Sequence, residues 1–458
     1  MKKTRIVQAV KSQYKYFGSG ATLTYKFRLD SLKKLKIAIQ KYEEKISEAL
    51  KKDLGKHEFE AYGTEISIVY TEINHAVKHL KKWMKAKRVS TPIASFGGVS
   101  KIHKQPMGVV LMMSPWNYPF MLAIAPVVAA IAAGNCVVLK PSSYSPNTST
   151  VIESMISEFF NEDYFTVFQG NREINSILLE QKYDYIFFTG STKVGKIVMK
   201  EAAKTVTPIT LELGGKSPCI VDESADIVKT AKRIIWGKSI NSGQTCIAPD
   251  YILVHKSVKD KLVDEMIKAK IKFFGESTMK SEYFGKIIRP QTFDSLVELI
   301  EGQKILYGGD YDVKSQKIEL TLLDNPSLES KVMEREIFGP ILPIIPVDDM
   351  SQAIEITRRY EKPLSLYLFT KDKVFEKKVI DSIHYGGGCI NDTIMHIANG
   401  SLPFGGIGES GMGGYHMDKG FETFSHTKSI LKQNFIFDMP IRYAPYKNKL
   451  GLIKMLIK

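Results

Sequence analysis

The stretch YDYIFFTGSTKVGKIVMKEAAKTVTPITLEL, residues 183–213, carries the clearest fold signal in the chain. Short runs of aromatic and β-branched residues stand at its two ends, and a glycine-containing turn and a helical pattern separate them. This order predicts a strand, a turn, a helix and a parallel strand. Ser191 or Thr192 can cap the helix, whose first N–H groups would then face an anion.

The turn in this stretch follows the phosphate-binding P-loop pattern up to its last position. Gly190, Gly195 and Lys196 fit G-x-x-x-x-G-K-[ST], but Ile197 stands where the pattern requires a hydroxyl that binds Mg²⁺. Because isoleucine has no oxygen with which to bind a metal, the turn predicts contact with phosphate without a magnesium ion of the kinase type.

The same alternation continues on both sides of this unit. Before it, GVVLMMS, CVVLK and YFTVF are further short apolar runs, which gives five strands and a doubly wound parallel sheet. After LELGGK the runs YILVH, ILPIIPV, SLYLFT and CIND predict a second α/β domain over residues 214–420. A literal G-x-G-x-x-G at Gly406, Gly408 and Gly411 follows SLPF rather than a strand, and we interpret it as a turn-rich loop.

Two amphipathic helices are predicted before residue 108. Apolar residues recur every three or four positions after Asp30, the expected N-cap, and stop before Gly55. A second such pattern runs from Phe59 to Leu80 and fades in the basic stretch KAKRVSTPIASFGGVSK, which we interpret as an excursion from the domain.

Length and composition are those of a soluble globular protein. A chain of 458 residues with 44% hydrophobic content suffices for two or three packed domains. The longest apolar run, residues 121–134, contains Pro126 and is shorter than the roughly 20 residues that cross a bilayer, so it predicts a buried helix. The N-terminus lacks the apolar core of a signal peptide, and we therefore expect a cytoplasmic protein.

The net charge of +15 favours anionic partners in general terms. Its lysines, however, are scattered over predicted helix faces, and no RRM or zinc-finger pattern accompanies them. We interpret the charge as a solvated surface and expect no binding to nucleic acid.

Four cysteines are spread along the chain without C-x-x-C pairing or neighbouring histidines, which argues against a zinc site and a disulfide framework. We expect no metal centre. Cys136, Cys219 and Cys389 stand apart from Cys246, which lies in NSGQTCIAPD among small and polar residues that leave its sulfur approachable. Cys246 is therefore the candidate nucleophile, whereas the alternative for any single cysteine is a small buried hydrophobe.

A thiolate nucleophile needs a donor for the developing oxyanion and a base that resolves the covalent intermediate. Asn117 in SPWNYPF follows the first predicted strand, where its amide can face a bound carbonyl. Glu212 in LELGGK and Glu336 in EIFGP are carboxylates in apolar or glycine-rich surroundings. Each of these residues, taken alone, is also compatible with a structural role.

Together these segments resemble the aldehyde dehydrogenase superfamily over nearly the whole chain and in the family's order. The short N-terminus and the ending YH followed by FETFSH resemble its class 3 branch, which acts on fatty and aromatic aldehydes. The matching segments are SPWNYPF, LKPS, FFTGSTKVGKIVM, LELGGKSP, NSGQTCIAPDYILV, EIFGPILPI, LPFGGIGESGMGGYH and FETFSHTKS.

The resemblance implies a role for each catalytic candidate. Cys246 would be the nucleophile, and Asn117 with the backbone N–H of Cys246 would form the oxyanion hole. Glu212 matches the family's general base, although Glu336, which lies near the cofactor ribose in relatives, is an alternative participant. The implied reaction oxidises an aldehyde to a carboxylate through a thiohemiacetal and a thioester.

The resemblance also implies a nicotinamide dinucleotide, NAD or NADP, as cofactor. Gly190, Ser191 and Gly195 match the turn beside its pyrophosphate, which makes Ile197 an ordinary residue of the helix core. Lys140 in LKPS matches the residue that binds the adenosine ribose, and Phe338 belongs to the cofactor segment EIFGP. Ser143 stands where most NAD-preferring relatives have glutamate, so we expect NADP⁺ to be used at least comparably to NAD⁺.

Four further residues fall in segments that line the substrate funnel of the family, and core packing is the alternative for each of them. His416 is the weakest, because Met417 and Asp418 follow it where relatives often have Gly-Lys. The four residues are Tyr118, Trp236, Phe404 and His416.

The resemblance implies a fold of two doubly wound α/β domains and a small β oligomerisation arm. Residues 1–84 and 108–213 would form the dinucleotide-binding domain, and residues 214–420 the catalytic domain. Residues 85–107 and 421–445 would form an arm that adds strands to a neighbour's sheet in a homodimer, followed by a basic tail at 446–458.

Two rival functions remain open at this stage. The first is a P-loop phosphotransferase, against which Ile197 and the lack of a convincing Walker B partner argue. The second is a basic membrane-surface protein whose tail LGLIKMLIK acts as an amphipathic anchor. Lipid contact through the tail is compatible with the enzyme as well, as a peripheral association.

Overall fold

Residues 183–213 fold into strand β6 (Tyr185–Thr189), helix α8 (Thr192–Ala203) and strand β7 (Ile209–Glu212), as their pattern predicts. The protein is described here by a computed structural model that covers residues 2–436 and 438–457. All five predicted strands join one sheet with the order β17-β7-β6-β3-β4-β5. The other strands of this sheet are β3 (Val109–Met113), β4 (Cys136–Lys140), β5 (Phe165–Val167) and β17 (Gly411–Met412).

Strands β3 to β7 run parallel, and the strand order reverses at one point of the sheet, which lies between the neighbouring strands β3 and β6. From β3 the chain moves to β4 and β5, and it then returns to the other side of β3 to form β6 and β7. This is the doubly wound arrangement, confirmed for the first domain. Its helices include α1 (Lys2–Gly18), α2 (Tyr25–Leu54), α3 (Glu58–Ala61), α4 (Ser67–Trp83), α5 (Met121–Ala133), α6 (Pro146–Phe159), α7 (Arg172–Leu179) and α15 (Met417–Thr423).

Helix α2 begins earlier than predicted. Thr24 is its N-cap, and the Thr24 hydroxyl accepts a hydrogen bond from the N–H of Phe27 at 3.2 Å. Asp30 lies within the helix and forms a salt bridge with Lys26 at 2.6 Å instead. The prediction of Asp30 as the N-cap was therefore wrong. An acidic residue near the start of a helix can instead form an ion pair with a lysine four residues away, as Asp30 does with Lys26. The predicted end at Gly55 is confirmed, since this glycine has a φ of 68° and closes the helix.

The second N-terminal helical pattern is interrupted. Between α3 and α4 the residues Tyr62–Ile66 form a π-helical turn, η2, which inserts a local widening into the helix. Helix α5 is buried along its whole length, as the apolar run predicted. Helix α1 had no predicted counterpart, and its Gln13 donates a hydrogen bond to the carbonyl of Val137 in β4 at 2.8 Å.

The second predicted domain is also present as a largely parallel sheet, with the order β10-β13-β14-β9-β8-β15-β16. Its strands are β8 (Pro218–Val221), β9 (Tyr251–His255), β10 (Ile305–Tyr307), β13 (Thr321–Asp324), β14 (Ile341–Val347), β15 (Ser365–Phe369) and β16 (Gly387–Ile390). A hairpin of β11 (Tyr311–Asp312) and β12 (Lys317–Ile318) accompanies it. The helices are α9 (Ile227–Ser239), α10 (Lys259–Phe274), α11 (Pro290–Ile300), α12 (Lys331–Glu334), α13 (Met350–Arg359) and α14 (Lys373–Ser382).

The chain returns to the first sheet before the expected domain boundary at residue 420. Strand β17 pairs antiparallel with β7, where Gly411 lies opposite Glu212. Helix α15 then packs on α4 and α5 of the first domain. The loop with Gly406 and Gly408 leads into β17, in agreement with its interpretation as a turn-rich segment.

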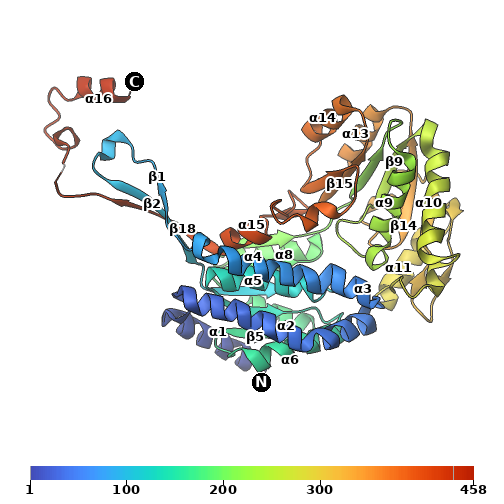
Figure 1. Cartoon of the computed structure of the whole chain (residues 1–458), viewed down its shortest axis with the longest axis horizontal. Helices are drawn as coiled ribbons and strands as arrows, with labels where there is room; N and C mark the ends of the chain where they lie inside the picture. The colour runs from blue at the N-terminus through green and yellow to red at the C-terminus, as the bar shows by residue number, and fades with distance from the viewer. Residues whose placement is uncertain (1, 437, 458) are drawn as a thin grey trace.

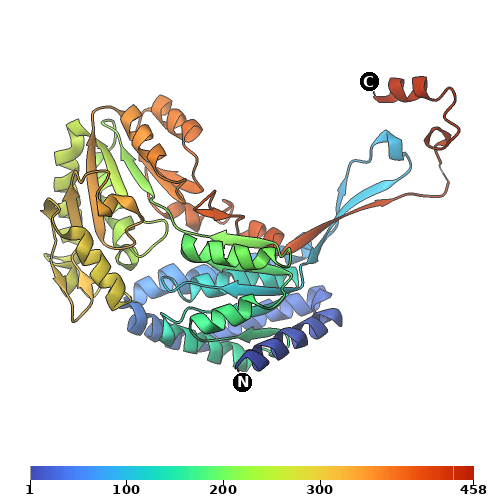
Figure 2. The same ribbon diagram turned by 180° about the vertical axis from the view of Figure 1, so that it is seen from behind.

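A narrow antiparallel sheet projects from the first domain (Figures 1 and 2). It consists of β1 (Lys87–Val89), β2 (Val99–Pro106) and β18 (Ser425–Lys432), in that order. We call this sheet the arm. The arm begins at Ser425 rather than at residue 421, because Met417–Thr423 still form α15.

Beyond the arm the chain ends in a short helix, α16 (Leu450–Ile457), at the tip of the projection (Figure 1). None of the helices within residues 2–436 and 438–457 combines the length and the hydropathy needed to cross a bilayer.

Candidate active site

The segment before Cys246 makes a tight left-handed turn between α9 and β9. Asn241 and Ser242 have φ values of 50° and 53°, and Gly243 has a φ of 73°. A Cβ at Gly243 would also lie 2.3 Å from the carbonyl oxygen of Gly339, so only glycine fits there. Strained residues of this kind persist where surrounding contacts hold them, often at functional sites. The turn leaves Cys246 partly accessible.

The surroundings of Cys246 oppose its ionisation. Burial raises the pKa of its thiol, and the charges of Glu336 and Glu212 raise this pKa further. Glu212 ends β7, is 2% exposed, and has no hydrogen-bond partner for either carboxylate oxygen within the described part of the chain. Burial raises the pKa of Glu212 well above its ordinary value. Glu212 is therefore a stronger base than an exposed carboxylate, once ionised.

Glu336 packs against the glycine turn that follows β7. A Cβ at Gly214 would lie 2.1 Å from Glu336 Oε2, and the Gly215 N–H donates a hydrogen bond to this carboxylate. Burial, followed by the charge of Asp250, raises the pKa of Glu336 to about 8. Phe338, two residues later, adopts a φ of 56°.

Asn117 links the loop after β3 to the turn before Cys246. Its Nδ2 donates a hydrogen bond to the carbonyl oxygen of Gln244 at 3.1 Å. The backbone carbonyl of Asn117 accepts a hydrogen bond from Asn241 Nδ2 at 2.8 Å. Because an amide nitrogen carries two protons, one proton of Asn117 Nδ2 is left for a substrate oxygen.

A buried ion pair, which the sequence analysis missed, holds the same loop. Lys56 and Glu65 have fully buried side chains and form a salt bridge. Glu65 accepts hydrogen bonds from the N–H groups of Phe120 and Met121 at 2.9 and 3.2 Å, and Lys56 donates to the carbonyl of Asn117 at 3.3 Å. No local pattern marks this pair, since its partners lie 55 to 61 residues further along the chain.

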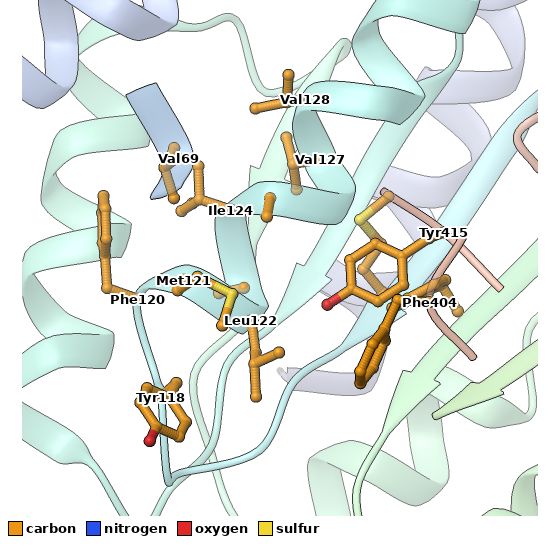
Figure 3. Close-up of a cluster of buried hydrophobic side chains, with 14 of the residues drawn as sticks. Val69, Tyr118, Phe120, Met121, Leu122, Ile124, Val127, Val128, Phe404 and Tyr415 are labelled. Atoms are coloured by element: carbon orange, nitrogen blue, oxygen red, sulfur yellow. The ribbon is translucent and has the colours of Figure 1, made fainter. Parts of the chain in front are cut away.

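Cys246 and Glu212 line a single cavity of about 360 Å³. Its wall is mainly apolar, and Figure 3 shows Leu122 at the start of α5 on one side and Phe404 and Tyr415 on the other. A cavity of this size with few polar groups fits a small apolar ligand. The structure brings all four predicted substrate residues to this cavity, namely Tyr118, Trp236, Phe404 and His416.

Two of these residues are fixed by short hydrogen bonds. The Tyr118 hydroxyl lies 2.6 Å from Thr245 Oγ1, next to Cys246 in the sequence. His416 Nδ1 lies 2.6 Å from Glu72 Oε1, and His416 itself has a φ of 81°. His416 Nε2 is buried without a partner within the described residues, and it is available to a ligand in the cavity.

Two of the predicted cofactor residues, Gly190 and Ser191, lie at the switch point of the first sheet. In doubly wound sheets, ligands bind outside the carboxyl ends of the strands where the strand order reverses. Gly190 and Ser191 form the turn after β6, at this position. A Cβ at Gly195 in α8 would lie 2.8 Å from Leu213, so glycine permits a close approach of the helix to β7.

Three details of this turn differ from the prediction. Ser191 occupies the N-cap position of α8 without a side-chain capping bond, and Thr192 donates its hydroxyl to the carbonyl of Glu409 at 3.1 Å instead. Ile197 is 42% exposed rather than part of the core. The buried residues of α8 are Gly195, Val198 and Ala202, and Ile197 lies on a different face of the helix. Lys196, the lysine of the P-loop pattern, forms a salt bridge with Glu409.

The remaining cofactor candidates are Lys140, which ends β4, and Ser143, which lies three residues later. Lys140 is 3% exposed, and burial lowers the pKa of its ammonium to about 8. Its Nζ donates to the carbonyl of Pro141 at 2.7 Å, which leaves further protons for a ligand. Ser143 lies in a hollow with three cationic side chains, Lys52, Lys286 and Arg289. These donors, with the N-terminus of α8, fit the hydroxyls and phosphates of NAD or NADP.

Comparison with known proteins agrees with this geometry. The sequence profile of the aldehyde dehydrogenase family matches residues 1–430. The chain is 45% identical over 445 residues to the 4,4'-diaponeurosporen-aldehyde dehydrogenase of Staphylococcus aureus, with 97% of each chain covered. It is 41% identical to a dog enzyme named aldehyde dehydrogenase, dimeric NADP-preferring, over 96% of this chain and 98% of the relative.

A solved structure described as the substrate-bound state of Staphylococcus aureus AldH shows the same fold. The two structures superimpose with a TM-score of 0.98 at 45% identity, and 99% of each chain is covered. The likeness therefore extends over both domains and the arm.

Proposed function

Since this chain belongs to the aldehyde dehydrogenase family of oxidoreductases, whose members oxidise aldehydes to acids, we propose that its substrates are apolar aliphatic or aromatic aldehydes and its oxidant is NAD⁺ or NADP⁺. The observation that carries this proposal is the shared cavity of Cys246 and Glu212, which is mainly apolar and about 360 Å³ in volume. A charged or sugar-like aldehyde would leave its polar groups without partners there.

In the proposed mechanism, the Cys246 thiolate attacks the aldehyde carbon and forms a thiohemiacetal. The carbonyl oxygen becomes an oxyanion, and the Asn117 amide and the Cys246 backbone N–H donate hydrogen bonds to it. The hydrogen bond from Asn117 Nδ2 to the Gln244 carbonyl orients the side-chain amide before substrate arrives, and the bond from Asn241 Nδ2 holds the backbone of Asn117. Because the amide is already in place, little reorganisation is needed during attack.

When bound, NAD⁺ or NADP⁺ would be held by Lys140, Ser143 and the turn after β6, and it would supply the acceptor for the hydride whose removal from the thiohemiacetal leaves a thioester on Cys246. Glu212 then removes a proton from a water molecule that attacks the thioester carbon, the C–S bond breaks, and the carboxylic acid and the Cys246 thiolate are released. We assign this step to Glu212 rather than Glu336, because Glu212 lines the cavity together with Cys246. Glu336 contacts the glycine turn after β7, and we assign it to the cofactor ribose.

Two substitutions test the proposal against a panel of aldehydes of varied chain length and aromaticity. Cys246→Ser should abolish oxidation with either cofactor, whereas Asn117→Ala should retain roughly one part in 10²–10³ of kcat, the usual cost of one oxyanion donor. Cys389→Ser is the matched control, because Cys389 is the other partly buried cysteine. Substantial turnover by pure, folded Cys246→Ser protein, or oxidation confined to strongly polar aldehydes, would refute the proposal.

We further propose that the enzyme is a cytoplasmic homodimer, with peripheral membrane contact through its tail. Free cysteines throughout the described chain suit a reducing compartment. The dog relative is named as dimeric, and the arm offers an exposed strand for pairing.

A further inference from the structure

Two histidines of α4 and an aspartate of α15 form a cluster outside the proposed active site. His75 and His79 are one helical turn apart on α4, and Asp418 reaches them from α15. Helix α15 lies next to α4 (Figure 1). One ligand atom from each residue lies within 4.8 Å of the other two. The HAVKH spacing is visible in the sequence, but its third member lies 343 residues beyond His75.

A hydrogen bond within α4 leaves the imidazole of His79 in the form that binds a metal. His79 Nδ1 lies 2.9 Å from the carbonyl oxygen of His75, and a carbonyl only accepts, so this nitrogen carries the proton and Nε2 keeps a free lone pair. A hydrogen bond from the ring nitrogen that does not bind the metal orients metal-binding histidines in general. The Trp83 ring stacks on His79 with a centroid distance of 5.9 Å, which further limits rotation of the imidazole.

The third ligand is already paired with a histidine. His75 Nε2 lies 2.7 Å from Asp418 Oδ1, where one proton is shared between the two atoms. A divalent cation can replace that proton and bind both atoms. Ligand atoms around zinc are roughly 3.3 Å apart for Zn–N bonds of about 2.0–2.1 Å. The Asp418 side chain, which is 66% exposed, can turn to close the remaining gap.

We propose that His75, His79 and Asp418 form a Zn²⁺ site, with water in the fourth position. Two imidazoles and one carboxylate suit zinc and similar first-row metals, whereas Ca²⁺ and Mg²⁺ prefer oxygen ligands alone. The site departs from the expectation of no metal centre, which rested on the cysteines. It is separate from the proposed catalytic residues, since its three ligands are absent from the described lining of the cavity.

The position of the site connects it to the wall of the cavity. Glu72, one turn before His75 on α4, binds His416 Nδ1 at 2.6 Å and accepts the N–H of Met417 at 3.1 Å. Glu72, His416 and Met417 all line the cavity. The bonds of Glu72 already join α4 to the start of α15 at the cavity wall. Zinc would therefore add a second link between these two helices, next to Glu72.

Zinc binding can be measured without any catalytic assay. The Cys246→Ser/Cys389→Ser double variant removes the two partly buried thiols that compete for metal. In this background, competition with a chromophoric chelator should show one tightly bound Zn²⁺ per chain. Cobalt substitution should give the d–d absorption bands of a site with nitrogen and oxygen ligands.

Variants of each ligand locate the metal. His75→Ala, His79→Ala and Asp418→Asn should each weaken zinc binding at least about tenfold, since even the loss of a second-shell partner costs about 10–100-fold. Asp418→Asn is the mildest of these, because the residue is exposed and the fold does not depend on its burial. His384→Ala, an exposed histidine elsewhere, should bind zinc as the parent does.

The zinc-free melting temperature of each variant reports whether it has folded. Absence of stoichiometric zinc in the parent, or equal affinity in the folded Asp418→Asn variant and the parent, would overturn the proposal. A zinc-dependent rise in melting temperature that the parent and His384→Ala share, and that the ligand variants lack, would support it.

Discussion

Cys246 must lose a proton before it can react, and its surroundings oppose this loss. Burial and the neighbouring carboxylates raise the pKa of the thiol, and the carboxyl of Glu336 titrates with a pKa of about 8. Ionisation of Glu336 adds a negative charge near the sulfur and raises the thiol pKa further. The cofactor-free protein therefore keeps its nucleophile in the unreactive thiol form at neutral pH.

This charge arrangement predicts a pH profile for alkylation. Iodoacetamide should modify Cys246 slowly near neutral pH, and the rate should still rise above the ordinary thiol pKa of about 8.5, because only the thiolate reacts. Mass spectrometry of protein labelled between about pH 6 and pH 10 measures the rate of Cys246 modification. Glu336→Gln removes a charge and should shift the profile to lower pH, while Glu298→Gln, at an exposed position of α11, should not. A rate that levels off near pH 7 in the parent would contradict this account.

Sequence patterns identified candidate residues for the site, but they did not indicate how those residues are held. Cys246 and Glu212 lie in distinctive local segments, and the structure places both in one cavity. The bond from the Phe120 N–H to Glu65 and the bond from Asn241 to Asn117 were missed, because such contacts join segments 55 or more residues apart. A local pattern contains no information on which distant backbone group a buried side chain will meet.

At the scale of elements, strand and helix types followed from hydrophobic periodicity, whereas helix ends and exposed faces did not. Both sheets appear where the alternation predicted them. The start of α2 was misplaced because several polar residues near it could cap a helix. Ile197 was assigned to the core from its chemistry, but the direction of α8 relative to the sheet decides which face is buried. That direction depends on the packing of Gly195 against β7.

Three elements meet around Ser143, and together they determine a preference between cofactors. The end of α2 contributes Lys52, and the segment before α11 contributes Lys286 and Arg289 to the same hollow. The one carboxylate there, Asp53, is already bonded to backbone and side-chain groups of the first turn of α6. The hollow is therefore net positive and suits a 2′-phosphate.

We accordingly expect NADP⁺ to be used at least comparably to NAD⁺. Ser143→Glu should lower kcat/KM for NADP⁺ relative to NAD⁺ by at least about tenfold, because like charges placed together cost several kcal/mol. Ser143→Ala, which adds no charge, is the control and should change the ratio little. If the parent's kcat/KM for NADP⁺ lay more than about a hundredfold below that for NAD⁺, this reading of the hollow would be wrong.

The terminal helix α16 exposes an apolar surface together with cations. Leu450, Leu452 and Met455 are 64%, 51% and 73% exposed; Lys447 precedes them, and Lys454 lies among them. Such a segment is expected to bind acidic lipid surfaces weakly. In flotation assays, the full chain should move with vesicles rich in acidic lipid and remain behind with neutral ones. A chain that ends at residue 449 should float with neither, and equal flotation of the two proteins would exclude the tail as the contact.

At the scale of the whole molecule, the arm predicts a homodimer. Strand β18 is an edge strand that pairs with β2 along its length within the chain, and its Ile430 and Leu431 side chains are 42% and 53% exposed. Long exposed edges of this kind pair with a further strand. Light scattering at micromolar concentration should give the mass of two chains. Ile430→Lys/Leu431→Lys should shift the mass toward one chain, whereas a monomeric parent would contradict the role of the arm.

The return of the chain to its first sheet at β17 restricts how the two domains can move. The polypeptide leaves the first sheet after β7 and enters the second at β8, and it comes back after β16 through the loop that ends in β17. The two chain segments that connect the domains therefore lie side by side at the first sheet, because β7 and β17 are paired strands. A domain that is joined to another through two adjacent connections loses most of the freedom to twist that a single linker would allow. We therefore expect any motion of the second domain relative to the first to be a bending about the line that joins the two connections, and access to the cavity, which both domains line, would vary mainly along that one coordinate.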